Sequence, residues 1–207
     1  MENQYIVTRR RPWENTDGLY MDEEIILEAW LEAAETIEEA LGRHCDVSCG
    51  VVNFNSGNFG RKVDKWPYWV ANPLNTRIIN LTPHEVTIML QDGTGDGNYD
   101  GINPKGCLYP LHIPSTGAAA RCESETIHSS FLRGTRIPLS RTVMGEISGL
   151  PEPEEGTVYI VSLTCAKKAW SQGRTDCFVT NETIRDKDNR IIGCQSLGAS
   201  PEYKAEL

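Results

Sequence analysis

From residue 77 onward, short apolar runs alternate with turn residues. Examples are LYPLHIP, TRIPL, GTVYIVSLTC, DCFVTNETIRD and RIIGCQSLG. Runs of this length, rich in β-branched residues and bounded by Gly, Pro, Asn or Asp, are typical of β-strands. The last two flank the segment 187–190, which predicts a short hairpin turn. This pattern favours a mostly antiparallel β-sheet or barrel.

One segment has a different period. Between Asp22 and Gly42 apolar residues recur at steps of three and four, which predicts an amphipathic helix that begins at an Asp N-cap and ends at a glycine. We therefore expect an α+β fold: a mostly antiparallel β-sheet or barrel domain with one long N-terminal amphipathic helix. The expected division is a helical appendage and aromatic connector over residues 1–74 and a β-rich core domain over residues 75–207.

Length and charge limit the functional classes. A chain of 207 residues can bury a core without disulfides, and a net charge of −9 disfavours generic binding to nucleic-acid backbones. No apolar stretch approaches the roughly 20 residues that span a bilayer, and the N-terminus lacks the apolar core of a signal peptide. The 7 cysteines, an odd number, favour free thiols in a reducing compartment. We expect a cytoplasmic protein that contacts no membrane.

Known cofactor and metal motifs are missing from the sequence. The chain has no Walker loop, nucleophile elbow, zinc-protease helix or dinucleotide fingerprint. Residues 92–103 alternate acids with small residues like a calcium loop, but the twelfth position is Asn103 instead of a glutamate. His44, Cys45 and Cys49 lack a second ligand pair at zinc-finger spacing. We expect neither a metal nor a cofactor.

A first group of candidate site residues surrounds an expected bend at Pro83. Asn80, Thr82 and His84 bring a carboxamide, a hydroxyl and an imidazole to the end of a predicted strand. Polar groups oriented by a bend of this kind commonly form binding sites. The alternative is that Asn80 and Thr82 only satisfy the hydrogen bonds of the turn while His84 caps the edge. The sequence leaves both interpretations open.

A second group consists of arginines among apolar residues. Guanidinium groups recognise phosphate or carboxylate through paired hydrogen bonds, and Arg121 and Arg174 are the candidates for that role. Asp176 stands two positions after Arg174 at a strand start, so both side chains are expected on one face. The alternative for each arginine is a surface ion pair. The predicted ligand site contains Asn80, Thr82, His84, Arg121, Arg174 and Asp176.

Four segments resemble a known group of proteins. They are NLTPHEV at 80–86, LPEPEEGTVYIVS at 150–162, GRTD at 173–176 and IRDKDNRIIGC at 184–194. Together they resemble a family of small uncharacterised proteins of bacteria and their phages, over roughly residues 77–198. The resemblance implies no residue roles. A phage setting would make counter-defence a natural role, such as sequestering a host nucleotide signal.

The leading hypothesis is a protein that binds a small anionic, nucleotide-derived ligand, because polar side chains gather at strand ends without a recognisable nucleophile and base. The first alternative is a hydrolase or transferase that acts on such a nucleotide, with His84 as general base. The second is an acidic interaction module that binds a basic partner. A second copy of the chain or a host protein is the macromolecular partner that these hypotheses allow.

Overall fold

The computed structural model describes most of the chain. The described residues are 2–14, 20–44, 52–54, 61–63, 68–70, 74–91 and 108–204. The calcium-like loop at 92–103, Cys45, Cys49 and most of the aromatic connector lie outside them. No helix among the described residues is long and apolar enough to cross a membrane.

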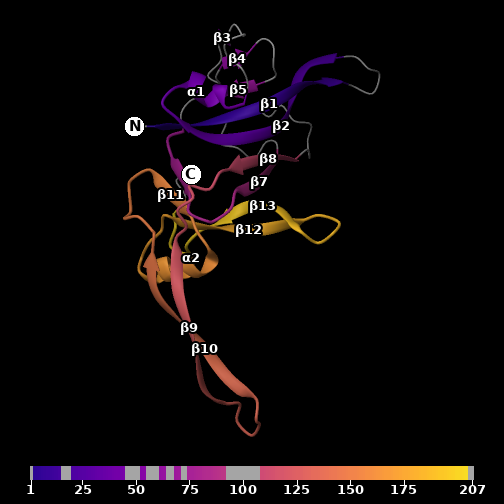
Figure 1. Cartoon of the computed structure of the whole chain (residues 1–207). Helices are drawn as coiled ribbons and strands as arrows, with labels where there is room; N and C mark the ends of the chain where they lie inside the picture. The colour runs from indigo at the N-terminus through magenta and orange to yellow at the C-terminus, as the bar shows by residue number, and fades with distance from the viewer. Residues whose placement is uncertain are drawn as a thin grey trace.

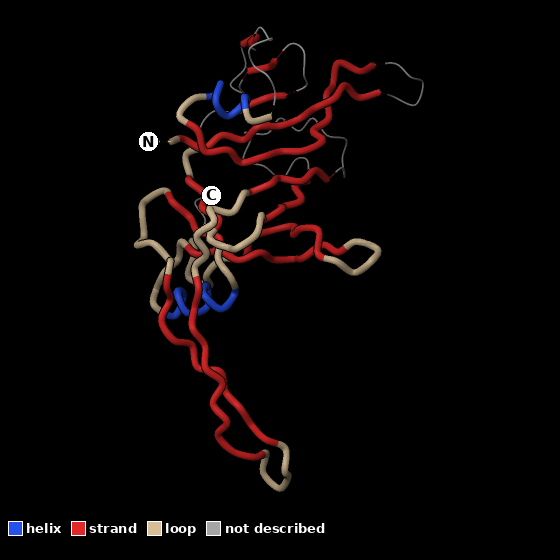
Figure 2. The backbone as a smooth tube through the Cα atoms, viewed as in Figure 1, coloured by secondary structure: helices blue, strands red, loops and turns tan. Residues whose placement is uncertain are grey.

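Strands dominate the described residues, and nearly all of them join one sheet (Figures 1 and 2). The strands of that sheet follow the order β3-β4-β5-β1-β2-β8-β7-β13-β12-β11-β6, while β9 and β10 form a separate two-stranded sheet. Their bounds are β1 (Asn3–Glu14), β2 (Tyr20–Ala34), β3 (Val52–Phe54), β4 (Arg61–Val63), β5 (Tyr68–Val70), β6 (Arg77–Asn80), β7 (Val86–Gln91), β8 (Leu108–Ile113), β9 (Arg121–Phe131), β10 (Pro138–Ser148), β11 (Thr157–Ile160), β12 (Cys177–Arg185) and β13 (Ile191–Gly198).

The long helix predicted from Asp22 to Gly42 is wrong. Most of that segment is the strand β2, and only Ile37–Gly42 forms a helix, α1. A strand lets β2 bury Ala29 and Leu31 in the main core while Trp30 packs against a second cluster beneath α1. A single helix would have covered only one apolar face. Pairing with β1 therefore determines the secondary structure of this segment, although its apolar residues recur with the period of a helix.

The neighbouring strand β1 also neutralises part of the negative charge of β2. The antiparallel register places Arg9 opposite Glu28, and the two side chains form an ion pair at 2.7 Å. In a helix, Glu28 and Glu32 would stand four residues apart and repel each other. The arginines that precede Pro12 thus belong to the strand that faces the acidic segment.

The short helix α1 begins at the N-cap Thr36, and Glu39 reaches back to the amide of Glu35, one residue before the N-cap. The Thr36 hydroxyl accepts a hydrogen bond from the Glu39 amide at 3.1 Å, and the Glu39 carboxylate accepts one from the Glu35 amide at 2.9 Å. Gly42 is the last residue of the helix and Arg43 is its C-cap, while its N-cap is Thr36 instead of the predicted Asp22.

A second helix, α2 (Leu163–Ser171), follows β11 and has no counterpart in the sequence prediction. Its buried residues Cys165, Ala166 and Ala169 pack against Tyr159 of β11 and Cys177 of β12. Because β11 pairs in parallel with both β6 and β12, the connection from β11 to β12 must cross over the sheet, and α2 supplies that crossover.

Antiparallel pairings predominate among the described strands, as the sequence predicts, but the main sheet also contains parallel pairings and is not a closed barrel. Parallel pairings join β2 to β8, β7 to β13, and β11 to both of its neighbours. The described sheet is open, with β3 at one edge and β6 at the other. The expected α+β class with a long helix is thus wrong: the described residues form a β-rich fold with two short helices. The domain boundary at residue 75 stays a prediction; β2 pairs with β8 across it.

The hairpin formed by β9 and β10 projects from the body of the molecule, and we call residues 121–148 the arm (Figure 1). At its base, Cys122 and Ile147 pack against the cluster around α2. Farther out, β9 and β10 pair only with each other among the described residues. The arm is directed away from β1, β2 and α1, which lie at the opposite end of the molecule.

Candidate functional site

The Asn80 side chain organises the turn after β6. It is 1% exposed, and its amide group donates hydrogen bonds to the carbonyls of His84 at 2.9 Å and Ile113 at 3.0 Å. Its Oδ1 accepts a hydrogen bond from the Thr82 amide at 2.9 Å. These contacts join the end of β6, the bend at Pro83 and the end of β8.

Thr82 and His84 belong to the same turn. The Thr82 hydroxyl lies 2.7 Å from Asn80 Oδ1 and 2.8 Å from the His84 carbonyl. The Ser115 hydroxyl donates to the Thr82 carbonyl at 2.5 Å, and the Thr116 amide donates to the Asn80 carbonyl at 3.1 Å. His84 takes part through its backbone, and its side chain is exposed. The geometry assigns these contacts of Asn80 and Thr82 to the turn itself.

Arg174 and Asp176 form a paired ion bridge just before β12. Nε and Nη2 of Arg174 donate to the two carboxylate oxygens of Asp176 at 2.8 and 2.7 Å, while Nη1 donates to the Pro151 carbonyl at 2.7 Å. The guanidinium carbon lies 5.7 Å from the centre of the Tyr159 ring. The hydrogen bond to Asp176, opposed by burial, raises the pKa of Arg174. In this arrangement the guanidinium holds a protein carboxylate.

The register separates this pair from the Asn80 turn. In the parallel strands β6, β11 and β12, Asn80 is opposite Ile160, which is opposite Phe178 near the start of β12. Asn80 lies at the end of β6, whereas Arg174 precedes β12. Asp176 precedes Phe178 by two positions, so the ion pair lies at the entry to β12, about two positions before the level of Asn80 and on the second strand from β6.

Arg121 lies close to the Asn80 turn in the backbone. The amide of the preceding residue, Ala120, donates to the Leu81 carbonyl at 2.9 Å, and the Arg121 side chain is exposed at the base of the arm. The structure therefore groups Asn80, Thr82, His84 and Arg121 around the turn after β6, and it holds Arg174 and Asp176 in a separate ion pair at the entry to β12.

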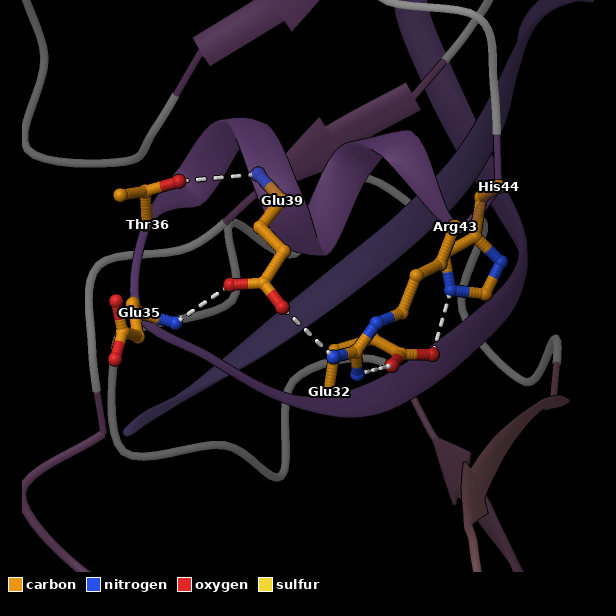
Figure 3. Close-up of polar contacts among 6 residues, drawn as sticks. All are labelled: Glu32, Glu35, Thr36, Glu39, Arg43 and His44. Carbon is orange, nitrogen blue, oxygen red and sulfur yellow. Dashed lines mark hydrogen bonds and ion pairs between the residues drawn. The ribbon is translucent and has the colours of Figure 1, made fainter. Parts of the chain in front are cut away.

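A polar cluster that the sequence analysis did not identify surrounds Glu32 (Figure 3). Its carboxylate contacts His44 Nε2 at 2.7 Å and Arg43 Nη1 at 2.8 Å, and Arg43 Nη2 contacts Glu39 at 3.2 Å. Burial raises the pKa of Glu32, but the hydrogen bonds and charges of His44 and Arg43 outweigh it, so the pKa is lowered overall. The cluster ties β2 to the end of α1.

Two imidazoles stack on Trp30. The ring centroids of Trp30 and His44 are 4.5 Å apart, and those of Trp30 and His112 are 6.1 Å apart. His112 Nδ1 contacts the Glu85 carboxylate at 2.8 Å. Each imidazole thus has a carboxylate partner, because His44 contacts Glu32. The Trp30 ring of β2 thus lies between His112 of β8 and His44, which follows α1.

The outer part of the arm combines apolar and basic side chains. From Ser130 to Met144 every side chain is exposed, including Phe131 at 63% and Ile137 at 58%. Residues 126–145 contain Arg133, Arg136 and Arg141 but no Asp or Glu. Exposed apolar residues grouped in this way mark interaction surfaces.

The described cysteines are free thiols that the fold protects. Cys165, Cys177 and Cys194 are buried and Cys122 is half-buried. Burial, aided by the charge of Asp176, raises the pKa of Cys177 to about 12, and burial also raises the pKa values of Cys122 and Cys194. Among the described residues, no group of three or more His, Cys, Asp or Glu side chains could hold a metal ion. The raised pKa values make Cys122, Cys177 and Cys194 poor nucleophiles at neutral pH.

No protein-family model, curated protein or solved structure matches this chain.

The arm is a structural feature that the sequence analysis did not identify. The runs that form β9 and β10 resemble ordinary strands, and nothing in their local pattern shows that both lack further partners. A signal was nevertheless present: a stretch with three arginines and no acid stands out in a chain of net charge −9.

Proposed function

We propose that this chain binds another protein to form a complex. In that complex the arm docks on an acidic surface of the partner. The observation that carries the proposal is the exposed set Phe131, Ile137 and Arg136 on a hairpin that leaves the body (Figure 1). Apolar anchors next to arginines are characteristic of the centres of protein interfaces.

The composition of the arm favours a protein partner over nucleic acid or membrane. Residues 121–148 contain arginines but no lysine. Arginine is enriched and lysine depleted at protein interfaces, whereas phosphate surfaces attract both. The acidic net charge of the whole chain would also oppose its approach to an anionic polymer or lipid surface.

A photo-crosslinking amino acid at Thr135, in the turn of the arm, tests this proposal in native cells. We expect adducts to a small set of proteins, and we expect the double substitution Phe131→Ser and Ile137→Ser to remove them. The matched control is Ile191→Ser in β13, because Ile191 is 58% exposed, as is Ile137. Adducts to nucleic acid or lipid alone, or adducts that survive the double substitution, would overturn the proposal.

The hypothesis of a small anionic ligand stays a second proposal. It is supported by the exposed side chains of His84 and Arg121, which belong to the same end of the sheet. Calorimetric titration with a panel of nucleotides, repeated on Arg121→Ala, tests it, and mass spectrometry of the incubated nucleotides distinguishes binding from hydrolysis or transfer. If no nucleotide of the panel bound to the folded protein, both the binding hypothesis and the enzyme hypothesis would be overturned.

A cytoplasmic location is proposed on the chemistry of the thiols. Cys122, Cys165, Cys177 and Cys194 are unpaired, and oxidising compartments favour disulfides. Fractionation of native cells, with alkylation of thiols at lysis, tests this location.

A further inference from the structure

The outer arm needs a partner for a physical reason. A two-stranded hairpin is marginally stable in water unless further strands or a helix cover its apolar side chains. Within the part of the chain that the structure describes, such cover is seen at the base of the arm, where Cys122 and Ile147 pack at α2. We propose that the partner is a second copy of this chain, with the arm of one copy docked on β2 and α1 of the next. This proposal rests on the proposed function of the arm.

Charge complementarity identifies this acceptor. Residues 20–42, which form β2 and α1, contain no Lys, Arg or His, and their acids are Asp22, Glu23, Glu24, Glu28, Glu32, Glu35, Glu38 and Glu39. Arg9 and Arg43 neutralise part of this charge, while the Glu35 side chain is exposed. On α1, the partly exposed Ile37 offers an apolar contact, whereas the Trp30 ring already stacks on His44 and His112. The arginines of residues 126–145 meet an opposite charge there.

The shape of the molecule requires that this contact form between copies. The arm and the β2–α1 region lie at opposite ends of one molecule, so an arm cannot reach the acidic region of its own chain (Figure 1). Arm-to-arm pairing would bring Arg133, Arg136 and Arg141 of both copies together without any acid from residues 126–145. The contact is therefore head-to-tail, and such contacts generate rings or open chains.

Analytical ultracentrifugation of the purified full chain tests the proposal. We expect oligomers whose fraction rises with protein concentration and falls as salt is raised, because the contact is partly electrostatic. Phe131→Ser with Ile137→Ser, and separately Arg133→Glu with Arg136→Glu, should each weaken self-association by about tenfold or more. The control Ile191→Ser should associate like the wild type. Circular dichroism establishes that each variant is folded.

Charge exchange and crosslinking locate the acceptor. The variant Glu35→Lys should self-associate more weakly and should bind the Arg136→Glu variant better than either variant binds itself. A photo-crosslinker at Thr135, in a mixture of ¹⁵N-labelled and unlabelled copies, should form adducts between copies at residues 20–44. Adducts confined to arms, or to another surface, would overturn the head-to-tail contact.

The outcomes separate this inference from the proposed function. A chain that is monomeric at every concentration, yet forms arm-dependent adducts with another protein in native cells, overturns the second copy as partner and leaves the docking arm intact. A monomeric chain without arm-dependent adducts in native cells overturns both.

Discussion

The guanidinium of Arg174 holds both carboxylate oxygens of Asp176, at 2.8 and 2.7 Å, and both side chains are mostly buried. The remaining terminal nitrogen of Arg174 donates to the Pro151 carbonyl. The arginine thus fastens the loop that enters β11 to the segment that enters β12. Its hydrogen-bonding capacity is directed to protein groups, which makes its contribution one of stability.

Replacing Arg174 with lysine should therefore lower the free energy of unfolding. A lysine offers a point charge instead of a planar fork, and it cannot hold both Asp176 oxygens and the Pro151 carbonyl together. We expect a loss of about 2 kcal/mol, below the full cost of breaking a completely buried pair. Urea denaturation measures it. Arg185→Lys, at an exposed turn contact, is the matched control and should change little; equal losses would contradict this role.

The Asn80→Asp variant should be destabilised in a pH-dependent way. The introduced carboxylate, when ionised, would face the His84 and Ile113 carbonyls to which the native amide donates, so we expect a loss of about 3 kcal/mol at neutral pH. Those carbonyls favour the protonated form, so the pKa of the introduced carboxyl group would be higher in the folded protein than in the unfolded chain. The deficit should be smallest below the unfolded pKa and should grow as pH rises through the folded pKa. Thermal unfolding of both proteins from pH 4 to 7 measures this trend, and a constant deficit would contradict it.

The contribution of Glu32 to stability also depends on pH, through a pKa that is shifted in the opposite direction. Its pKa is lowered from 4.5 in the folded protein, so its contribution is present above the unfolded pKa and is lost as pH falls through the folded value. We expect Glu32→Gln to be less stable than wild type at pH 6, with the gap closing below about pH 4. Chemical denaturation at each pH measures the gap. Glu85→Gln, whose carboxylate is more exposed, should show a smaller gap; the reverse order would argue against the Glu32 cluster.

The described thiols should differ in their rates of alkylation. Cys177 is buried and its pKa is raised to about 12, so the reactive thiolate is scarce at pH 8. Half-buried Cys122 should react before Cys165, Cys177 and Cys194. Timed labelling of the native protein with iodoacetamide, followed by peptide mass spectrometry, gives the order. The denatured protein is the control, in which all four should react; early labelling of native Cys177 would contradict its protected environment.

Local features were predictable where local chemistry decides them. The Pro83 bend between β6 and β7 and the turn before Ile191 follow from proline and turn residues, and both are present. In that second turn, Asp186 Oδ1 accepts hydrogen bonds from the amides of Asp188 and Arg190, a contact that the sequence analysis did not specify. The helix α2 was missed because its apolar residues continue the run of β11 without an intervening turn signal.

Long-range features were not predictable from the residues alone. The contacts of Arg174 with Pro151 and of Glu32 with His44 depend on segments brought together by the sheet. The arm was missed for a related reason, because exposure depends on which strands lie beside β9 and β10. The error over β2 has the same origin: Arg9 and its neighbours on β1 supply a pairing that no local period reveals.

A peptide spanning residues 22–42 tests that account of β2. Without β1, its apolar period should again favour a helix, although isolated helices of this length are marginal in water. Repulsion between glutamates four residues apart should limit the helix at pH 7, and protonation should relieve it at pH 3. We therefore expect circular dichroism to show helix that increases on acidification, while the full chain keeps residues 20–34 extended in backbone NMR shifts. A peptide without helix at either pH would mean that intrinsic preference, and not pairing with β1, selects the strand.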